Sequence, residues 1–363
     1  MAHEHLSRRV FLTASSGAAA AAMSTGDNER LETRDLDDRP PPTGIIDCQS
    51  HLFAPELLAY MEKRTEPPHI YSKDGQRFLA VGHWHRPMVG GIDLDAKLAA
   101  KDAAGIQVTA LSTNDPGPDQ FGSEGAAVAR MIHDFLADVV RRHPTRFFAL
   151  ATLPLQDRAV AEAELDHCVG KLGMKGILLY SNIAGRFPDE PEFRWLFAAA
   201  ERTGLPVLLH PPYPTCYEQT KGFNLTGGLG LMFDTTIALA RIILAGVLDE
   251  HPKLKLVCPH VGGTLPYLIG RIDHQVTVLK RVKLTIQQRP SDYLRMIYFD
   301  AVNALPAVIR FGIDLVGPER MLYSSDHPWV SPKLIIDNVR SLKLSAEHER
   351  MVFAENARKL FQL

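Results

Sequence analysis

Short apolar runs rich in β-branched residues recur along most of the chain, and each is followed by a loop and then by an amphipathic or alanine-rich segment. This alternation predicts parallel strands that are joined by helical crossovers. The expected strands are 44–51, 108–113, 147–154, 176–181, 206–210, 255–260, 297–302 and 321–326, and the expected helices include 126–142, 159–172, 192–203, 233–249 and 305–311. Eight such units predict an α/β protein of the (β/α)₈ TIM-barrel class.

A long segment from about residue 53 to residue 93 separates the first expected strand from the next helical region. It contains Pro67-Pro68 and His83-Trp84-His85, and it fits neither a crossover helix nor a short loop. We expect it to be an insertion after strand one that forms a lid over the mouth of the barrel. No G-x-G-x-x-G motif follows the first strand, so a dinucleotide-binding sheet has no positive support.

The N-terminus has the pattern of a targeting segment. Arg8-Arg9 precede a modest apolar run that ends in alanines 18–22, which predicts a twin-arginine export signal over residues 1–23. The alternative is a disordered tail that carries two arginines by chance. The apolar run is too short for a stable membrane span. We therefore expect a periplasmic or secreted mature protein that is not held in a membrane.

Residues 24–43 are charged and rich in proline, as in a disordered linker, so the folded barrel domain is expected over 44–363. The composition is that of an ordinary globular protein, with 45% hydrophobic and 23% charged residues and a net charge of −2. No basic stripe is present, which argues against nucleic acid as a partner and leaves a small molecule. The four cysteines occur singly, which favours buried thiols over a thiolate zinc site or a disulfide framework.

Polar residues stand at the ends of four expected strands. His51 ends strand one, His210 strand five, His260 strand six and Asp326 strand eight. Active sites of such barrels lie at the carboxyl ends of the strands, so these four side chains are expected to converge. One such residue alone would be explained equally well as a cap or a satisfied core group, but four on one rim are harder to explain in that way.

Imidazoles together with a carboxylate suit Zn²⁺ or a similar divalent ion that keeps one position open. Such an ion polarises an oxygen and lowers the pKa of its water. A further histidine beside it can transfer protons, because the ordinary histidine pKa lies near neutral pH. His260 suits this second role best.

The sequence resembles the decarboxylase-like branch of the amidohydrolase superfamily, which includes aminocarboxymuconate-semialdehyde decarboxylase and resorcylate decarboxylases. The resemblance runs from about Ile45 to the C-terminus. It rests on segments 46–51 (IDCQSH), 101–106 (KDAAGI), 143–147 (HPTRF), 153–155 (LPL), 204–212 (GLPVLLHPP), 259–263 (PHVGG), 270–273 (GRID) and 323–328 (YSSDHP).

The resemblance implies that His51, His210 and Asp326 bind the metal, with Asp326 also part of the catalytic group, and that His260 performs acid–base chemistry. The family has an H-x-H pair after strand one, and this sequence differs from it because Gln49 stands in place of the first histidine. The amide oxygen of Gln49 is a weak ligand. We expect one divalent ion, zinc first and manganese or magnesium as alternatives. The fourth strand carries no lysine at its outer end that could bridge a second ion.

Residues near the same rim are candidates for substrate binding: Arg86, Tyr180, Asn182, Tyr213 and Trp329. Arg86 can clamp a carboxylate, although a solvated loop arginine is the simpler explanation. Trp329 can stack on an aromatic ring or pack against the last helix. His83 and His85 can replace the missing imidazole, although an exposed loop explains them more simply. Asp300 can orient a residue at the mouth or cap the next helix.

Three functions remain open from these residues. The first is a metal-dependent carboxy-lyase that acts on a small aromatic or unsaturated carboxylate, which the resemblance favours. The second is a metal-dependent hydrolase of a lactone, ester or amide, because the same ligands serve both reactions. The third is a metal-poor barrel that binds a small molecule without turnover, as Gln49 suggests. A homodimer is expected from the resemblance alone.

Overall fold

The computed structural model describes residues 44–90 and 92–363. The expected export signal over 1–23 and the expected linker over 24–43 lie outside the described residues, and so does the boundary between that linker and the barrel domain.

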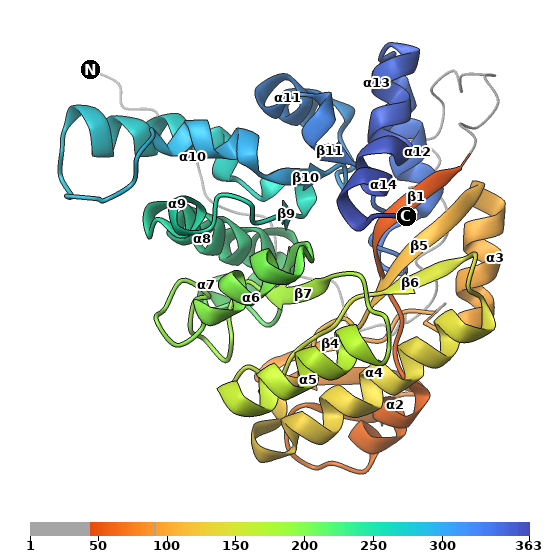
Figure 1. Cartoon of the computed structure of the whole chain (residues 1–363). Coiled ribbons are helices and arrows are strands. Elements are labelled where there is room, and N and C mark those ends of the chain that lie inside the picture. The colour runs from red at the N-terminus through yellow and green to blue at the C-terminus, as the bar shows by residue number, and fades with distance from the viewer. Residues whose placement is uncertain (1–43, 91) are drawn as a thin grey trace, which may run out of the picture. The chain divides into compact units, whose positions relative to one another are not determined.

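Eight parallel strands occur in the order in which the sequence predicts them, and each is followed by a crossover helix (Figure 1). The crossovers are α3, α4, α5, α6, α8, α10, α11 and α12. The strands are β1 (Ile45–His51), β5 (Ile106–Ser112), β6 (Phe147–Ala149), β7 (Ile177–Tyr180), β8 (Val207–His210), β9 (Leu256–Cys258), β10 (Tyr298–Asp300) and β11 (Met321–Leu322).

The helices are α2 (Pro55–Glu62), α3 (Leu94–Ala104), α4 (Gly125–Arg142), α5 (Arg158–Gly170), α6 (Trp195–Thr203), α7 (Tyr217–Thr220), α8 (Leu231–Leu244), α9 (Val247–Glu250), α10 (Leu265–Asp273), α11 (Pro306–Val316), α12 (Pro332–Ser341), α13 (Ala346–Arg350) and α14 (Asn356–Phe361). Short 3₁₀ and π turns are η1 (Pro118–Glu124), η2 (Gly222–Asn224), η3 (Thr226–Gly230), η4 (His260–Gly262), η5 (His274–Val278), η6 (Pro290–Met296), η7 (Pro318–Arg320) and η8 (Met351–Glu355).

The parallel strands form a three-stranded sheet, β1-β5-β6, and a five-stranded sheet, β11-β10-β9-β8-β7. Isolated parallel bridges link these two sheets on both sides, between Ser50 and His327 and between Ala151 and Ile177. The backbone N–H of His51 donates to the carbonyl of His327 at 2.8 Å, and that of Ala151 to the carbonyl of Gly176 at 2.9 Å. The strand order and the crossovers are those of a TIM barrel.

Alternate residues of the strands belong to two separate apolar clusters. Leu178 and Tyr180 belong to an inner cluster, whereas Ile177 and Leu179 belong to the larger cluster between strands and helices. This alternation follows from the two-residue period of a strand. The inner cluster also contains four residues from the end of the chain, Ala354, Ala357, Leu360 and Phe361, and the ring of Phe361 lies 4.8 Å from that of Phe148. The predicted C-terminal packing helix therefore fills part of the barrel interior.

Side-chain caps and a glycine mark the ends of helices α3 and α5. The Asp93 carboxylate accepts from the backbone N–H of Ala96 at the start of α3, and Gly105 ends that helix in the left-handed conformation at φ 69°. At the start of α5, the Asp157 carboxylate accepts from the N–H of Val160 in the same way.

The insertion after β1 contains α2 and a separate antiparallel sheet of β2 (His69–Lys73), β3 (Gln76–Val81) and β4 (Trp84–Pro87). Among the described residues, one helical stretch, Thr226–Leu244, is long and apolar enough to cross a membrane. That stretch includes α8, whose Leu239, Ile242 and Ile243 are buried in the core as expected of a crossover helix.

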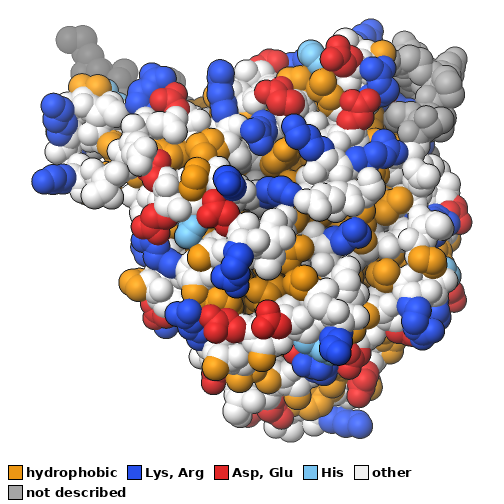
Figure 2. Space-filling model, in the orientation of Figure 1, with side chains coloured by type: hydrophobic (Ala, Val, Ile, Leu, Met, Phe, Trp, Pro, Cys, Tyr) orange, Lys and Arg blue, Asp and Glu red, His pale blue; other side chains and the backbone are white. Residues whose placement is uncertain are grey.

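All four cysteines are free thiols, and Cys48, Cys168 and Cys258 are buried. Lys, Arg, Asp and Glu side chains are interspersed over the face shown in Figure 2, where no continuous basic stripe is present. The free and mostly buried thiols agree with the expectation from the single cysteines.

Helix α3 places two lysines in the core, although lysine is rarely buried without a charged partner. Lys97 and Lys101 are 1% and 2% exposed. The ammonium of Lys101 donates to Thr109 Oγ1 at 2.6 Å and lies 4.9 Å from the centre of the Phe147 ring. Burial lowers the pKa of Lys101 to about 7, although the charge of Asp47 opposes this effect.

The low pKa of Lys101 predicts a pH dependence of stability. Between about pH 7 and 10.5 the unfolded chain holds a proton on this lysine that the folded protein releases, so the free energy of unfolding rises with pH across that window. A shift of this size corresponds to roughly 5 kcal/mol, at about 1.4 kcal/mol per pKa unit. Replacement Lys101→Met should flatten the rise, measured as the urea midpoint from pH 7 to 10. An unchanged slope would contradict the prediction.

Candidate metal centre

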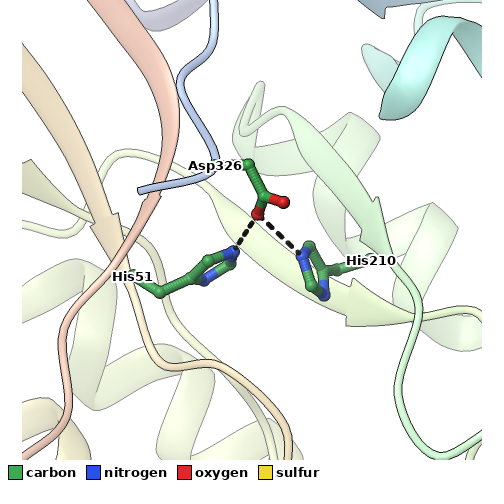
Figure 3. A group of neighbouring side chains, drawn as sticks. All are labelled: His51, His210 and Asp326. Carbon is green, nitrogen blue, oxygen red and sulfur yellow. Dashed lines mark hydrogen bonds and ion pairs between the residues drawn. The ribbon is translucent and has the colours of Figure 1, made fainter. Parts of the chain in front are cut away.

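Three predicted site residues meet at one point at the carboxyl ends of the strands (Figure 3). His51 is the last residue of β1 and His210 the last residue of β8. Asp326 was expected to end its strand, but β11 stops at Leu322 and Asp326 lies in the loop beyond it. One potential ligand atom from each residue lies within 4.8 Å of the others. The sequence-based expectation that these side chains converge is met.

The spacing of these atoms suits a divalent ion. Asp326 Oδ1 lies 3.1 Å from His51 Nε2 and 3.8 Å from His210 Nε2. Ligand atoms bound at about 2.1 Å to one ion are roughly 3.0–3.4 Å apart, so small adjustments would bring all three into range. Both ring nitrogens of His210 are buried without a hydrogen-bond partner. An unpartnered buried imidazole next to a carboxylate is what a metal ligand looks like in the absence of its ion.

The orientation of His51 points to the same conclusion. Its Nδ1 lies 3.2 Å from the backbone carbonyl of Thr113 and 3.1 Å from Ser112 Oγ. A carbonyl only accepts hydrogen bonds, so Nδ1 carries a proton and Nε2 is the nitrogen that faces Asp326. A lone pair on Nε2 and the carboxylate oxygen would repel each other unless a proton or a cation lay between them. Thr113 therefore holds His51 in the form that binds a metal.

Gln49 lies beside the three predicted ligands. Its Nε2 donates to Asp326 Oδ1 at 3.0 Å and is 3.4 Å from His51 Nε2, whereas its buried Oε1 has no partner. A half rotation of the amide exchanges the two atoms and would present the oxygen to an ion. Gln49 therefore stands at the position expected of a fourth, weaker ligand.

The charges of the group are set by burial and by mutual contact. Burial alone would raise the pKa of Asp326, but hydrogen bonding and the charges of the surrounding histidines hold this pKa well below its usual range. Burial lowers the pKa of His210 to about 3, and the nearby charge of His51 adds to this effect. At neutral pH Asp326 is thus a carboxylate and His210 is neutral, which are the forms that coordinate metals.

His260 lies at the edge of the same group, as predicted for a proton-transfer residue. Its Nε2 is 3.6 Å from Asp326 Oδ2, and its Nδ1 is buried without a partner. Burial acts to lower the pKa of His260, but the negative charges of Asp326 and Asp300 outweigh it and raise this pKa. His260 therefore retains its proton to a higher pH than an ordinary histidine does.

The backbone around His260 is strained. His260 and Val261 have φ of 56° and 54°, values rarely adopted by residues other than glycine, and Asp326 has 54°. Asp300, at the end of β10, accepts through Oδ1 from the backbone N–H of His260 at 2.7 Å and of Val302 at 3.1 Å. Asp300 thus orients His260 at the mouth, which is the first of the two interpretations that the sequence allowed.

Arg86 lies at the rim and is mostly buried, so it is not the solvated loop arginine that was the simpler interpretation of the sequence. Its side chain is 12% exposed and its guanidinium lies between the rings of Trp84 and Trp329, 4.6 and 5.1 Å from their centres. Its Nη2 donates to the backbone carbonyl of Asp115 at 2.7 Å, and its buried Nε has no partner. Trp329 therefore packs on Arg86.

Tyr180 lies next to His210, with ring centres 6.5 Å apart, and its buried hydroxyl has no partner. Burial raises the pKa of Tyr180 well above its usual value, and the charges of Asp115 and Asp119 add to this, so the phenol remains a hydrogen-bond donor. Tyr180 Oη and Arg86 Nε are thus two buried donors, free of protein partners, near the same rim.

Asn182 and Tyr213 line a cavity of about 680 Å³ together with His83, Gln120 and Tyr217, and none of the three predicted ligands is part of its lining. Asn182 Nδ2 donates to Asp234 Oδ2 at 2.8 Å, and its Oδ1 accepts from the N–H of Gly185. The amide of Asn182 is therefore engaged within the protein, which leaves it an indirect role in shaping the mouth.

His83 and His85 are exposed and stay outside the metal group, so the expectation of an exposed loop fits better than that of a replacement ligand. A second group that could hold an ion, His133, Glu164 and Cys168, is saturated by its own contacts. Glu164 binds Arg130 at 2.5 Å and His133 at 2.6 Å, and His133 Nε2 accepts from the N–H of Thr152.

Sequence reasoning missed the residues that hold the ligands in place. Ser112, the last residue of β5, and Thr113, which follows it, fix His51. Asp47 Oδ2 accepts from Ser325 Oγ at 2.7 Å, next to Asp326. Small polar residues at strand ends are too common to be singled out without coordinates.

Comparison with known proteins agrees with this geometry. The sequence profile of the Amidohydrolase family matches residues 46–363. A gamma-resorcylate decarboxylase from Rhizobium sp. (strain MTP-10005) is 30% identical over 341 residues, covering 88% of this chain and 98% of the relative. A 2-amino-3-carboxymuconate-6-semialdehyde decarboxylase from Dictyostelium discoideum is 26% identical over 249 residues, covering 67% of this chain and 68% of the relative.

Among solved structures, a 2,6-dihydroxybenzoate decarboxylase complexed with 2,6-dihydroxybenzoate matches with a TM-score of 0.73 and 26% identity, covering 89% of this chain and all (100%) of the other. A dihydroxybenzoic acid decarboxylase from Polaromonas sp. JS666 with bound manganese has the same fold, with a TM-score of 0.72 and 23% identity over 89% of this chain and 98% of the other. The profile match and the relatives establish that this chain belongs to the amidohydrolase family.

Proposed function

We propose that this protein is a metal-dependent decarboxylase that removes the carboxylate of a small aromatic acid as CO₂. The observation that carries the proposal is His260, a protonatable imidazole 3.6 Å from the carboxylate of the metal group, in a chain related to aromatic-acid decarboxylases. Decarboxylation of an aromatic acid requires a proton donor at the ring carbon that loses CO₂. His260 is the donor that the site provides.

His51, His210 and Asp326 would hold the ion, with Gln49 as a weaker fourth ligand. A divalent ion bound there supplies a Lewis acid that polarises a substrate oxygen. His260 donates its proton to the ring carbon as the bond to the carboxylate breaks, and the electron pair of that bond becomes the new C–H bond. The raised pKa of His260 keeps this proton available at neutral pH. Asp300 holds the backbone of His260 so that the imidazole faces the group.

Arg86 and Tyr180 would position the substrate. Both present donors without protein partners near the rim, and both donors are buried, so a substrate oxygen would bind there without competition from bulk water. The ring of Trp329, packed on Arg86, offers a flat surface for an aromatic substrate.

The insertion that carries Arg86 would act as the lid. Tyr217 Oη donates to the carbonyl of His83 at 2.7 Å, at the turn between β3 and β4. Gly82, next to it, has φ 55°, and an added Cβ there would lie 3.0 Å from the Tyr213 ring. The loop after β8 therefore contacts the turn between β3 and β4, and residues of both line the cavity.

The metal, if bound, is expected to be manganese or zinc. The group offers two imidazoles, a carboxylate and an amide oxygen, and the replacement of an imidazole by an amide favours a harder ion than zinc. Manganese bound to the Polaromonas protein makes Mn²⁺ the first ion to test.

The reaction can be tested with dihydroxybenzoates, salicylates and aromatic lactones supplied to protein reconstituted with Mn²⁺ or Zn²⁺. We expect CO₂ release from at least one aromatic acid and its loss after chelation. Replacement His260→Asn should lower kcat by roughly 100-fold or more, the usual contribution of a positioned proton donor, with little effect on metal content.

Acid release from a lactone or ester without CO₂ release would favour the hydrolase instead. Less than about one-third of an equivalent of any divalent ion, with no activation on adding metal, would favour the metal-poor binding barrel over both enzymes.

The role of Arg86 can be tested separately. Arg86→Gln should raise KM by roughly 10- to 100-fold, because a hydrogen bond to a charged group contributes about 1.5–3 kcal/mol. Arg77→Gln is the matched control, since Arg77 lies on the neighbouring strand β3 and pairs with Glu62 at the surface. Steady-state kinetics with the best aromatic acid provides the measurement, and equal KM for the two variants would exclude Arg86 from substrate binding.

A further inference from the structure

A buried lysine links β1, which carries His51, to the loop after β11, which carries Asp326. Lys97, on α3, is 1% exposed. Its Nζ donates to Ser50 Oγ at 2.6 Å and to the backbone carbonyl of His327 at 3.2 Å, and it lies 2.9 Å from His327 Nδ1. Ser50 immediately precedes His51 and His327 immediately follows Asp326. Lys97 therefore contacts the neighbours of two predicted ligands at once.

Backbone hydrogen bonds join β1 to the segment that follows β11. The N–H of Cys48 donates to the carbonyl of Tyr323 at 3.0 Å, that of Asp326 to the carbonyl of Gln49 at 3.0 Å, and that of His51 to the carbonyl of His327 at 2.8 Å. The last of these lies at the isolated bridge between Ser50 and His327, where Ser50 Oγ also donates to the His327 carbonyl at 3.3 Å. The ammonium of Lys97 lies at this bridge and contacts both of its residues.

Among the described residues, no carboxylate is hydrogen-bonded to the Lys97 ammonium. Its hydrogen-bond partners are a hydroxyl, a carbonyl and an imidazole nitrogen, and the charges of Asp47 and Asp326 favour its charged form only from a distance. Burial outweighs these two charges and lowers the pKa of Lys97, so the buried ammonium costs stability. A buried charged side chain that costs stability but has hydrogen-bond partners on all sides is typical of residues that hold a functional site in shape.

We propose that Lys97 is a positioning residue for the metal centre, which holds Ser50 and His327 so that His51 and Asp326 face the same ion. The inference rests on the proposed function insofar as it requires that the group bind a divalent ion. It assigns to α3 a task beyond its role as a crossover helix.

Charge and geometry predict opposite effects of removing this lysine. The Lys97 ammonium is a positive charge near a site for a cation, so its charge alone weakens metal binding and its removal would tighten binding. Loss of the positioning contacts would weaken binding, by about 10- to 100-fold for partners that orient ligands. The direction of the change therefore separates the two effects.

The test is a titration of chelator-stripped protein with Mn²⁺, followed by the electron paramagnetic resonance signal of free Mn²⁺. We expect Lys97→Met to raise the Kd by at least tenfold. Lys101→Met is the matched control, because Lys101 lies one turn farther along α3, is equally buried and contacts Thr109 instead of a neighbour of a ligand. Its Kd should stay within about threefold of the wild-type value, as mutations without shared partners act independently.

A milder variant guards against misfolding of Lys97→Met. Ser50→Ala removes one acceptor of the ammonium and should also raise the Kd for Mn²⁺. In the double variant, the fold increase in Kd should be smaller than the product of the two single increases. A Kd for Lys97→Met equal to or below that of the wild type, or strict additivity with Ser50→Ala, would overturn the positioning role. Absence of Mn²⁺ and Zn²⁺ binding by the wild-type protein would overturn the metal-centre proposal itself and the inference with it.

Discussion

The site is organised around one buried negative charge. Asp326 has Gln49 and His51 from β1, His210 from β8 and His260 from η4 as neighbours. A carboxylate in such a place is stable only with positive charge or hydrogen-bond donors close to it. Burial lowers the pKa of His210 to about 3, so this imidazole is neutral and a cation at the centre would satisfy both it and the carboxylate. The barrel brings these side chains together, and the negative charge of Asp326 favours a cation among them.

Most of the fold could be predicted from the sequence because the strands are buried on both faces. Buried strands must be apolar and short, and eight such runs with crossovers between them allow few topologies. The strand ends were less predictable. The expected strand 147–154 ends at Ala149 and the expected strand 321–326 ends at Leu322, because backbone pairing stops before the apolar pattern does.

The ligands could be predicted for a related reason, since carboxyl ends of parallel strands share one edge. The environment of Arg86 could not, because its burial depends on Trp84 from the insertion and Trp329 from the far end of the chain. Lys97 was missed as well. Two lysines four residues apart on a helix face usually point to solvent, but both are buried here, and the contacts of Lys97 with Ser50 and His327 become apparent only in the structure.

The last helix has a consequence for how the molecule is made. Ala357, Leu360 and Phe361 belong to the same inner cluster as residues of β1, β6 and the other strands, so the hydrophobic filling of the barrel comes partly from a segment translated after all eight strands. Strands that emerge early from the ribosome must wait for this segment before their inner faces are covered. During synthesis the nascent barrel would thus expose apolar surface until α14 emerges, a period in which chaperones are best placed to bind it.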